Sequence, residues 1–261
     1  MRLKWFGTAT ILLEHDGAQL LFDPFISLNE NAYKPVMGEL SDTENILVTH
    51  GHLDHIADIP AILSHGCGRT KVYCTGRPRG TLLSKGVPEK SIKLIAPGDV
   101  LALGPFEVDV LKGKHIVIDR KLKIRTVISP RILTNWSKVM HIRKENKICT
   151  EGGETVAYYV KTQDKKVLLL GSLNLDENTV YPQDADLLIL PLQGRSDINV
   201  YAMQIIDRLL PKRVLLDHFD DSFPPISSSV STAQFISLMS SRHPGVPVIC
   251  PQAGDAWIAA E

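Results

Sequence analysis

Short apolar runs separated by turn residues recur along this chain and predict a protein with many buried strands. The expected strands lie within residues 2–24 and at residues 46–49, 71–75, 93–96, 100–103, 106–111, 155–160, 166–170, 187–192, 214–218 and 246–250. The expected helices cover residues 59–64, 79–85, 198–210 and 233–241. Strands and helices that alternate in this way predict a layered α/β fold, in which loops at the strand ends form the functional site.

Two segments fall outside this pattern. Residues 25–44 are irregular, which fits either a loop over the site or an ordinary long connection. Residues 116–150 have poor periodicity and a high basic content, which fits either a lid at the substrate site or a surface insertion. The chain of 261 residues is long for one domain, but layered α/β folds reach this length. We therefore expect a single domain over residues 1–261.

The densest cluster of candidate ligands follows the apolar residues 46–49, in the sequence His50-Gly51-His52-Leu53-Asp54-His55. Residues two apart on an extended strand point to the same side, so His50 and His52 can face one point. A turn after Leu53 would bring Asp54 and His55 toward a second point beside the first. A single histidine is more often structural, but this density favours a site for zinc or a similar metal.

Two further histidines come at the ends of expected strands. His115 follows the strand at residues 106–111 and can complete a three-imidazole site with His50 and His52. His218 ends the strand at residues 214–218. These positions place both side chains where a layered α/β fold forms its site.

The overall charge favours no particular class of partner, because Lys plus Arg and Asp plus Glu both number 29. Residues 112–147 are different, since they contain 11 Lys or Arg against only Asp119 and Glu145. This segment would either attract an anionic substrate or form a solvated basic face.

The remaining composition indicates a soluble, cytoplasmic protein. The four cysteines are scattered and form no CxxC pair, so no disulfide framework is expected. The first residues lack the apolar core of a signal peptide, and no apolar run approaches 18 residues. We therefore expect no membrane partner, and whether the chain forms a homo-oligomer is left open.

The residues above resemble the metallo-β-lactamase-fold superfamily. The sequence from His50 to His55 matches its HxHxDH motif in full, and residues 5–11 and 20–24 are similar to its first strands. The resemblance covers essentially the whole chain and is strongest to the short bacterial metal-dependent hydrolases of this superfamily. It implies a four-layer αββα sandwich.

The resemblance also implies two neighbouring metal sites. Site one would consist of His50, His52 and His115, and site two of Asp54, His55 and His218. The expected cofactor is one or two Zn²⁺ ions, with Mn²⁺ or Fe²⁺ as alternatives. Three imidazoles and a water form a complete zinc site, so site one could function alone.

One position departs from the superfamily pattern. An aspartate that bridges two metals usually follows a glycine after the strand at residues 166–170, whereas this chain has Gly171-Ser172. A neutral serine hydroxyl is a poor ligand, and Asp176 could replace the carboxylate only if its loop folds back. We therefore expect site two to bind metal weakly or not at all.

The resemblance implies a hydrolase in which the metal activates a water molecule. Asp54 would orient that water or act as a base, and His218 would bind the second metal or donate a proton. The basic segment favours a small anionic ester, lactone or phosphoester as substrate. One alternative, motivated by Ser172, is a degenerate member that binds metal or ligand without turnover. The other is a nucleic-acid phosphodiesterase, although the chain has little room for the additional substrate-binding domain that many such relatives carry.

Overall fold

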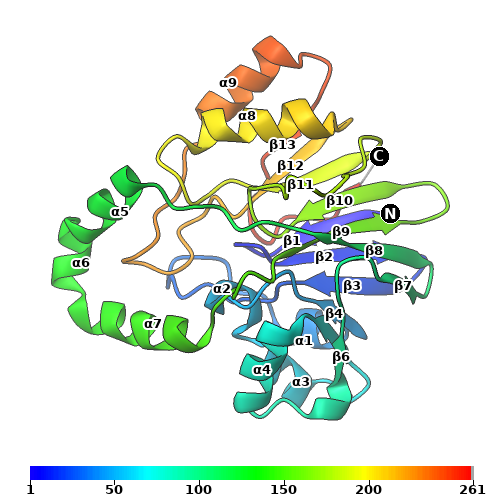
Figure 1. Cartoon of the computed structure of the whole chain (residues 1–261). Coiled ribbons are helices and arrows are strands. Elements are labelled where there is room, and N and C mark those ends of the chain that lie inside the picture. The colour runs from blue at the N-terminus through cyan, green and yellow to red at the C-terminus, as the bar shows by residue number, and fades with distance from the viewer. Residues whose placement is uncertain (260–261) are drawn as a thin grey trace.

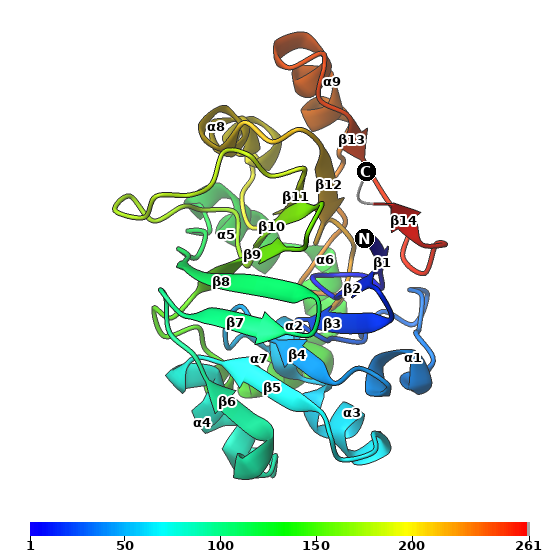
Figure 2. The same cartoon turned by 90° about the vertical axis from the view of Figure 1, so that its right-hand side faces the viewer.

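Two mixed β-sheets lie face to face in the structure, a computed structural model that describes residues 1–259 (Figures 1 and 2). The first sheet has the strand order β14 (Ile258–Ala259), β1 (Arg2–Trp5), β2 (Ile11–His15), β3 (Ala18–Phe22), β4 (Asn45–Leu47), β5 (Lys71–Cys74) and β6 (Ile92–Leu94). The second sheet has the order β13 (Val248–Ile249), β12 (Val214–Asp217), β11 (Leu187–Pro191), β10 (Lys166–Leu170), β9 (Val156–Lys161), β8 (Phe106–Lys112) and β7 (Val100–Leu103).

Helices cover the outer face of each sheet (Figure 1). On the first sheet lie α1 (Met37–Ser41), α2 (Leu53–Ile56), α3 (Ile59–His65) and α4 (Gly76–Ser84), and the short 3-10 helix η1 (Glu89–Ser91) precedes β6. On the second sheet lie α8 (Ile198–Leu209) and α9 (Ala233–Arg242). The result is a four-layer αββα sandwich, which confirms the expected fold class.

The alternation of side chains along each strand explains these layers. On β2, Leu13 belongs to the core between the sheets, whereas Leu12 belongs to the core beneath α1 to α4. On β10, Leu169 points between the sheets and Leu168 points toward α8 and α9. Because successive side chains on a strand point to opposite faces, strands covered on both sides must be apolar throughout.

The carboxyl ends of the central strands meet at one edge of the sandwich. In the first sheet β3, β4 and β5 are parallel. In the second sheet β10, β11 and β12 are parallel, and β8 runs the same way because both β8 and β10 are antiparallel to β9. Loops at this edge therefore bring together residues that are far apart in the sequence.

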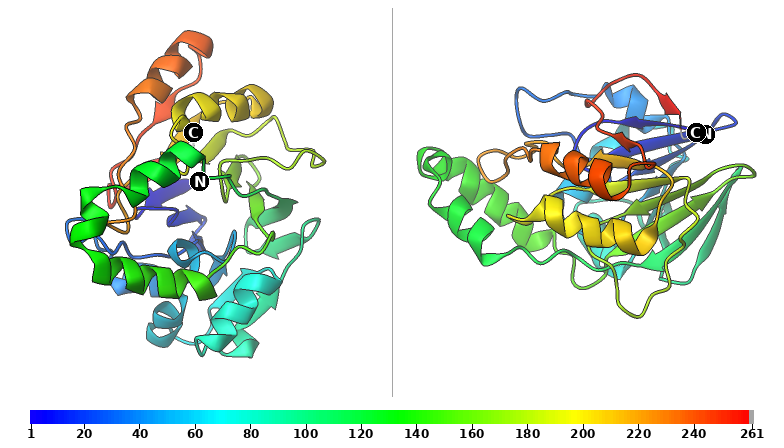
Figure 3. Two further views of the ribbon diagram at one scale, coloured as in Figure 1. Left: turned by 60° about the vertical axis from the view of Figure 1, so that its left-hand side comes forward. Right: turned by 90° about the horizontal axis from the view of Figure 1, so that it is seen from above.

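Residues 117–148 leave the sandwich as a protruding segment, which we call the arm (Figures 1 and 3). It contains the helices α5 (Arg120–Val127), α6 (Pro130–Thr134) and α7 (Trp136–Ile148). The sequence analysis predicted no helix here. Many of its large apolar side chains are exposed rather than confined to one buried face, so the usual helical periodicity is missing.

Other differences from the sequence prediction are local. The predicted helix at residues 198–210 is confirmed as α8, whereas α4 begins three residues before the predicted start of 79. The irregular residues 25–44 contain the short helix α1, and the turn after Leu53 is the single-turn helix α2. Within residues 1–259, no helix is long and apolar enough to cross a membrane.

Replacement of Gly171 by alanine should destabilise the fold, because this glycine packs tightly against Thr49 and Val156. The added Cβ atom would lie 2.4 Å from Cβ of Thr49 and 2.6 Å from the carbonyl oxygen of Val156. We expect Gly171→Ala to lower the free energy of unfolding by about 1–3 kcal/mol in urea titrations. The control is Gly38→Ala in exposed α1, where nothing lies within 4 Å. Equal effects in both variants would contradict this packing argument.

Candidate metal centre

Three histidines converge at the edge where the strands end. His50 and His52 follow β4, and His115 follows β8 of the other sheet. Their ring centroids are 4.6–5.0 Å apart, and one side-chain nitrogen of each lies within 4.8 Å of the other two. The structure therefore brings together all three residues that the sequence analysis assigned to site one.

Hydrogen bonds orient these rings for a shared ligand. Nδ1 of His115 donates to the carbonyl oxygen of Ile116 at 2.8 Å, which leaves its Nε2 with a free lone pair. Nδ1 of His50 lies 3.0 Å from the hydroxyl of Thr49, and its Nε2 lies 3.1 Å from Nδ1 of His52. Two nitrogens bound to one tetrahedral zinc ion stand roughly 3.3 Å apart, so the spacing fits a metal.

Burial keeps the three imidazoles neutral. It lowers the pKa of His50 well below its usual value, and the neighbouring histidines lower it further. Burial lowers the pKa of His52 to about 4 and also lowers that of His115. Neutral imidazole is the form that binds metals, so this group offers three lone pairs at neutral pH.

A second group lies beside the first. Asp54 and His55 are held by the single turn of α2, and His218 follows β12; their ligand atoms also lie within 4.8 Å of one another. Nε2 of His218 lies 3.1 Å from Oδ2 of Asp54. These are the three residues that the sequence analysis assigned to site two.

Asp54 and His218 form a buried ion pair in this group. Burial alone would lower the pKa of His218, but the hydrogen bond and charge of Asp54 raise it to about 9. Burial would raise the pKa of Asp54, but the charges of His55 and His218, together with the hydrogen bond from His218, hold it well below its usual value. The second group therefore carries the only strongly anionic candidate ligand of the two groups.

Thr49 and Asp23, which no sequence motif singled out, support both groups. The backbone N–H and the hydroxyl of Thr49 donate to the carboxylate of Asp23 at 2.7 and 2.6 Å. Nδ1 of His55 lies 2.8 Å from the same carboxylate, which leaves Nε2 of His55 to face the site. A carboxylate that orients a histidine ligand in this way raises its basicity and fixes its tautomer. The available signal was an aspartate at the end of an otherwise apolar strand.

Strained backbone marks the same region. Thr8, Asp23 and His218 have positive φ angles of 51, 44 and 57°, which non-glycine residues rarely adopt. The His218 N–H donates to the carbonyl oxygen of Thr8 at 2.8 Å, and the Thr8 N–H donates to the carboxylate of Asp220 at 3.0 Å. Such strain persists where the surrounding contacts enforce it, and it occurs most often at functional sites.

Ser172 lies at the site, whereas Asp176 does not. The Ser172 hydroxyl accepts a hydrogen bond from the Ile116 N–H at 3.0 Å and borders the cavity above the histidines. The Asp176 carboxylate is 3.1 Å from Nζ of Lys112 and accepts hydrogen bonds from Asn178 and Thr179. Its loop does not fold back, so no aspartate replaces the missing bridging carboxylate.

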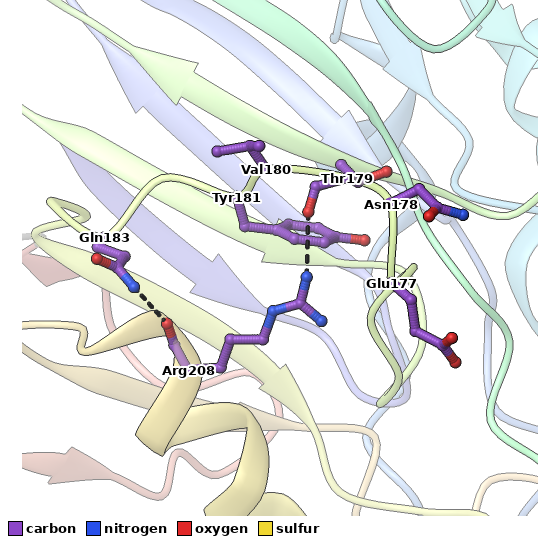
Figure 4. Close-up of a pocket in the computed structure, with 7 residues that line it drawn as sticks. All are labelled: Glu177, Asn178, Thr179, Val180, Tyr181, Gln183 and Arg208. Carbon is purple, nitrogen blue, oxygen red and sulfur yellow. Dashed lines mark hydrogen bonds between the residues drawn. The ribbon is translucent and has the colours of Figure 1, made fainter.

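Both ligand groups open into a cavity of about 550 Å³, which is bounded on its far side by the arm. A second cavity, of about 370 Å³, lies elsewhere, between the loop 177–183 and α8 (Figure 4). There the guanidinium of Arg208 lies over the ring of Tyr181 and donates to the carbonyl oxygens of Asp176 and Thr179. Arg208 therefore has a structural role in holding this loop. Because the candidate ligands line the first cavity, that cavity is the candidate site.

Comparisons with known proteins agree with this geometry. A family model described as "Beta-lactamase superfamily domain" matches residues 2–218. A protein named UPF0173 metal-dependent hydrolase from Methylobacterium nodulans is 26% identical over 261 residues and covers 98% of each chain. A protein of the same description from Methanopyrus kandleri is 25% identical, over 87% of this chain and 86% of its own length.

Two solved structures share the fold. Igni18, a metallo hydrolase from Ignicoccus hospitalis, aligns over 99% of this chain and 98% of its own with a TM-score of 0.66 and 16% identity. An isothiocyanate hydrolase from gut bacteria of Delia radicum aligns over 99% of both chains with a TM-score of 0.64 and 14% identity.

Asp23→Asn should weaken metal binding by the second group more than by the first. The variant loses the charge that supports His55 and presents an amide nitrogen to the donors of Thr49. We expect the affinity of the second group for Zn²⁺ to fall about 10- to 100-fold in calorimetric titrations.

The control for this variant is Asp99→Asn. The Asp99 carboxylate also accepts a backbone hydrogen bond, from the Ala96 N–H at 2.8 Å, but it does not border the cavity. Its metal affinities should match those of the unaltered protein. An Asp23→Asn variant with unchanged zinc affinity would show that Asp23 is only a structural residue.

Proposed function

We propose that this chain, which belongs to the β-lactamase superfamily, is a metal-dependent hydrolase. The observation that carries the proposal is the convergence of three neutral imidazoles from both sheets on the floor of a cavity. The names of the relatives from Methylobacterium nodulans and Methanopyrus kandleri support the same activity.

His50, His52 and His115 would hold the tighter metal ion. Their donor set, three nitrogens with lowered pKa values, suits Zn²⁺, and Mn²⁺ or Fe²⁺ are the alternatives. Asp54, His55 and His218 would hold a second ion more weakly. Two dications about 3.5–4 Å apart repel each other, and Ser172 supplies no negative charge to offset this repulsion.

A metal bound by the three histidines would supply Lewis acidity and a nucleophilic water at neutral pH. Asp54 borders the same cavity and would orient that water or accept its proton. His218, hydrogen-bonded to Asp54, would bind the second ion or, without it, donate a proton or hydrogen bond to the leaving group.

The substrate would be a small anionic ester, lactone or phosphoester. Lys123 of the arm borders the cavity, and its ammonium group has no partner among residues 1–259. The other basic residues of the arm are exposed and would add a long-range attraction for anions. The second candidate function, ligand binding without turnover, is favoured only by Ser172.

Metal analysis tests this proposal directly. Protein purified without chelator should contain about one tightly held metal ion per chain, and chelation should abolish ester hydrolysis until Zn²⁺ is restored. His115→Ala should lose the tightly held ion, whereas His141→Ala, in an exposed part of the arm, should retain it. A protein that binds no metal, or that hydrolyses equally well without it, would exclude the proposed mechanism.

Restoring the carboxylate at position 172 should create a stronger second site. We expect Ser172→Asp to raise the affinity for a second metal ion at least tenfold in equilibrium titrations, because a negative charge would then lie between the two ions. Ser172→Asn, of similar size but neutral, should show no such gain. If neither variant changes the second affinity, the serine does not limit metal binding.

A further inference from the structure

We propose that the substrate carries an aliphatic chain, which lies between the metal centre and the arm while the bond to be cleaved lies at the histidines. This inference rests on the proposed hydrolase function and specifies its substrate class. It follows from the contrast between the polar ligand cluster and the mostly apolar remainder of the lining of the 550 Å³ cavity.

The cavity has a polar floor at the candidate ligands, and most of its remaining lining is apolar. The six candidate ligands and Ser172 form the polar floor. The rest of the lining comes from distant parts of the chain and includes the apolar residues Leu122, Ile142, Leu173, Phe223, Ile226 and Val230. Polar residues such as Asn146, Gln193 and Arg195 interrupt this apolar surface. The volume is in the range of pockets that enclose a whole small ligand. A short polar substrate would leave most of these apolar side chains facing water.

Helix α5 presents one face to this cavity. Leu122, Lys123, Thr126 and Val127 border it, whereas Ile124 and Ile128 do not. The spacing of the bordering residues is that of neighbours on one side of an α-helix. Two of these four residues, Leu122 and Val127, are apolar, so this face of α5 adds apolar surface to the cavity beside Lys123.

Contacts at several points hold the arm over the site. Asp119 accepts hydrogen bonds from the N–H groups of Leu122 and Ser196, and so caps α5 and ties it to the loop before α8. Arg131 of α6 pairs with Asp221 at 2.6 Å, and Glu145 of α7 pairs with Lys85, the residue that follows α4, at 2.9 Å. The arm is therefore bound to the sandwich through the loop before α8, through Asp221 and through Lys85.

Lys123 adds to this wall a cation that has no partner among residues 1–259. It lies on the same face of α5 as Leu122 and Val127. A substrate with both an aliphatic chain and an anionic group would contact the apolar lining and pair with the ammonium group of Lys123. A medium-chain acyl compound with a carboxylate or phosphate group has this chemistry.

Binding of straight-chain fatty acids to the metal-containing protein tests the inference without requiring turnover. Butanoate, hexanoate, octanoate and decanoate share one carboxylate and differ only in length. We expect affinity in calorimetric titrations to rise about fourfold per methylene, which is about 0.8 kcal/mol, until the cavity is filled. The heat capacity of binding should become more negative along the series. Equal affinities for butanoate and octanoate would overturn the proposal.

Two matched double variants locate the chain-binding wall. Leu122→Asn with Val127→Asn alters the cavity face of α5, and Ile124→Asn with Ile128→Asn alters its other face. Val127 and Ile128 are both 68% exposed, so the two variants disturb the fold to a similar extent. The first should flatten the dependence of affinity on chain length, and the second should retain it. Metal content should be unchanged in both.

The outcomes separate this inference from the proposed function. Hydrolysis of short esters without any dependence of binding on chain length would leave the hydrolase intact and reject the aliphatic substrate. Length-dependent binding without hydrolysis of any acyl ester would reject turnover and leave the chain-binding cavity. If both double variants behave alike, α5 does not form the wall.

Discussion

The buried carboxylate of Asp23 and its contact with Thr49 position the two sheets of this structure relative to each other. Thr49 donates two hydrogen bonds to Asp23, and its carbonyl oxygen accepts from the Val156 N–H of the other sheet at 2.9 Å. Gly171 packs against Thr49 at the same point. Thr49 thus connects the end of β3, the loop that begins at His50, and the second sheet through its backbone and its hydroxyl together. Because the ligand histidines come from both sheets, their convergence depends on this junction.

The two ligand groups differ in charge, and this difference organises the proposed chemistry. The first group is neutral and buried, so it is ready to bind a cation without losing a proton. The second group already contains an ion pair between Asp54 and His218, so a metal ion must compete with the proton of His218. Where relatives of this fold usually place an aspartate, Ser172 offers only a hydroxyl that accepts from Ile116. Both features should lower the metal affinity of the second group relative to that of the first.

The sequence was sufficient to predict the fold class, because buried strands leave a strong apolar pattern and the HxHxDH motif is specific for this fold. The positions of His115 and His218 at strand ends were also readable, since strand ends mark the functional edge of a layered fold. The role of Asp23 was not readable, because its partners, Thr49 and His55, become neighbours only after β3 and β4 pair. The sequence also could not exclude Asp176 as a metal ligand, because its pairing with Lys112 is visible only in the structure.

The arm shows why pattern alone fails for a segment that does not pack into the main core. Its helices α5 and α7 carry apolar residues on more than one face, because one face borders the cavity and others face solvent. Periodicity therefore disappears, although the helices are capped and held by Asp119, Arg131 and Glu145. Most of the basic residues of the arm lie outside the cavity, whose lining is mostly apolar away from the candidate ligands. In the proposed function, the exposed basic residues would attract an anionic substrate from a distance, whereas Lys123 and the apolar side chains beside it would contact the bound substrate.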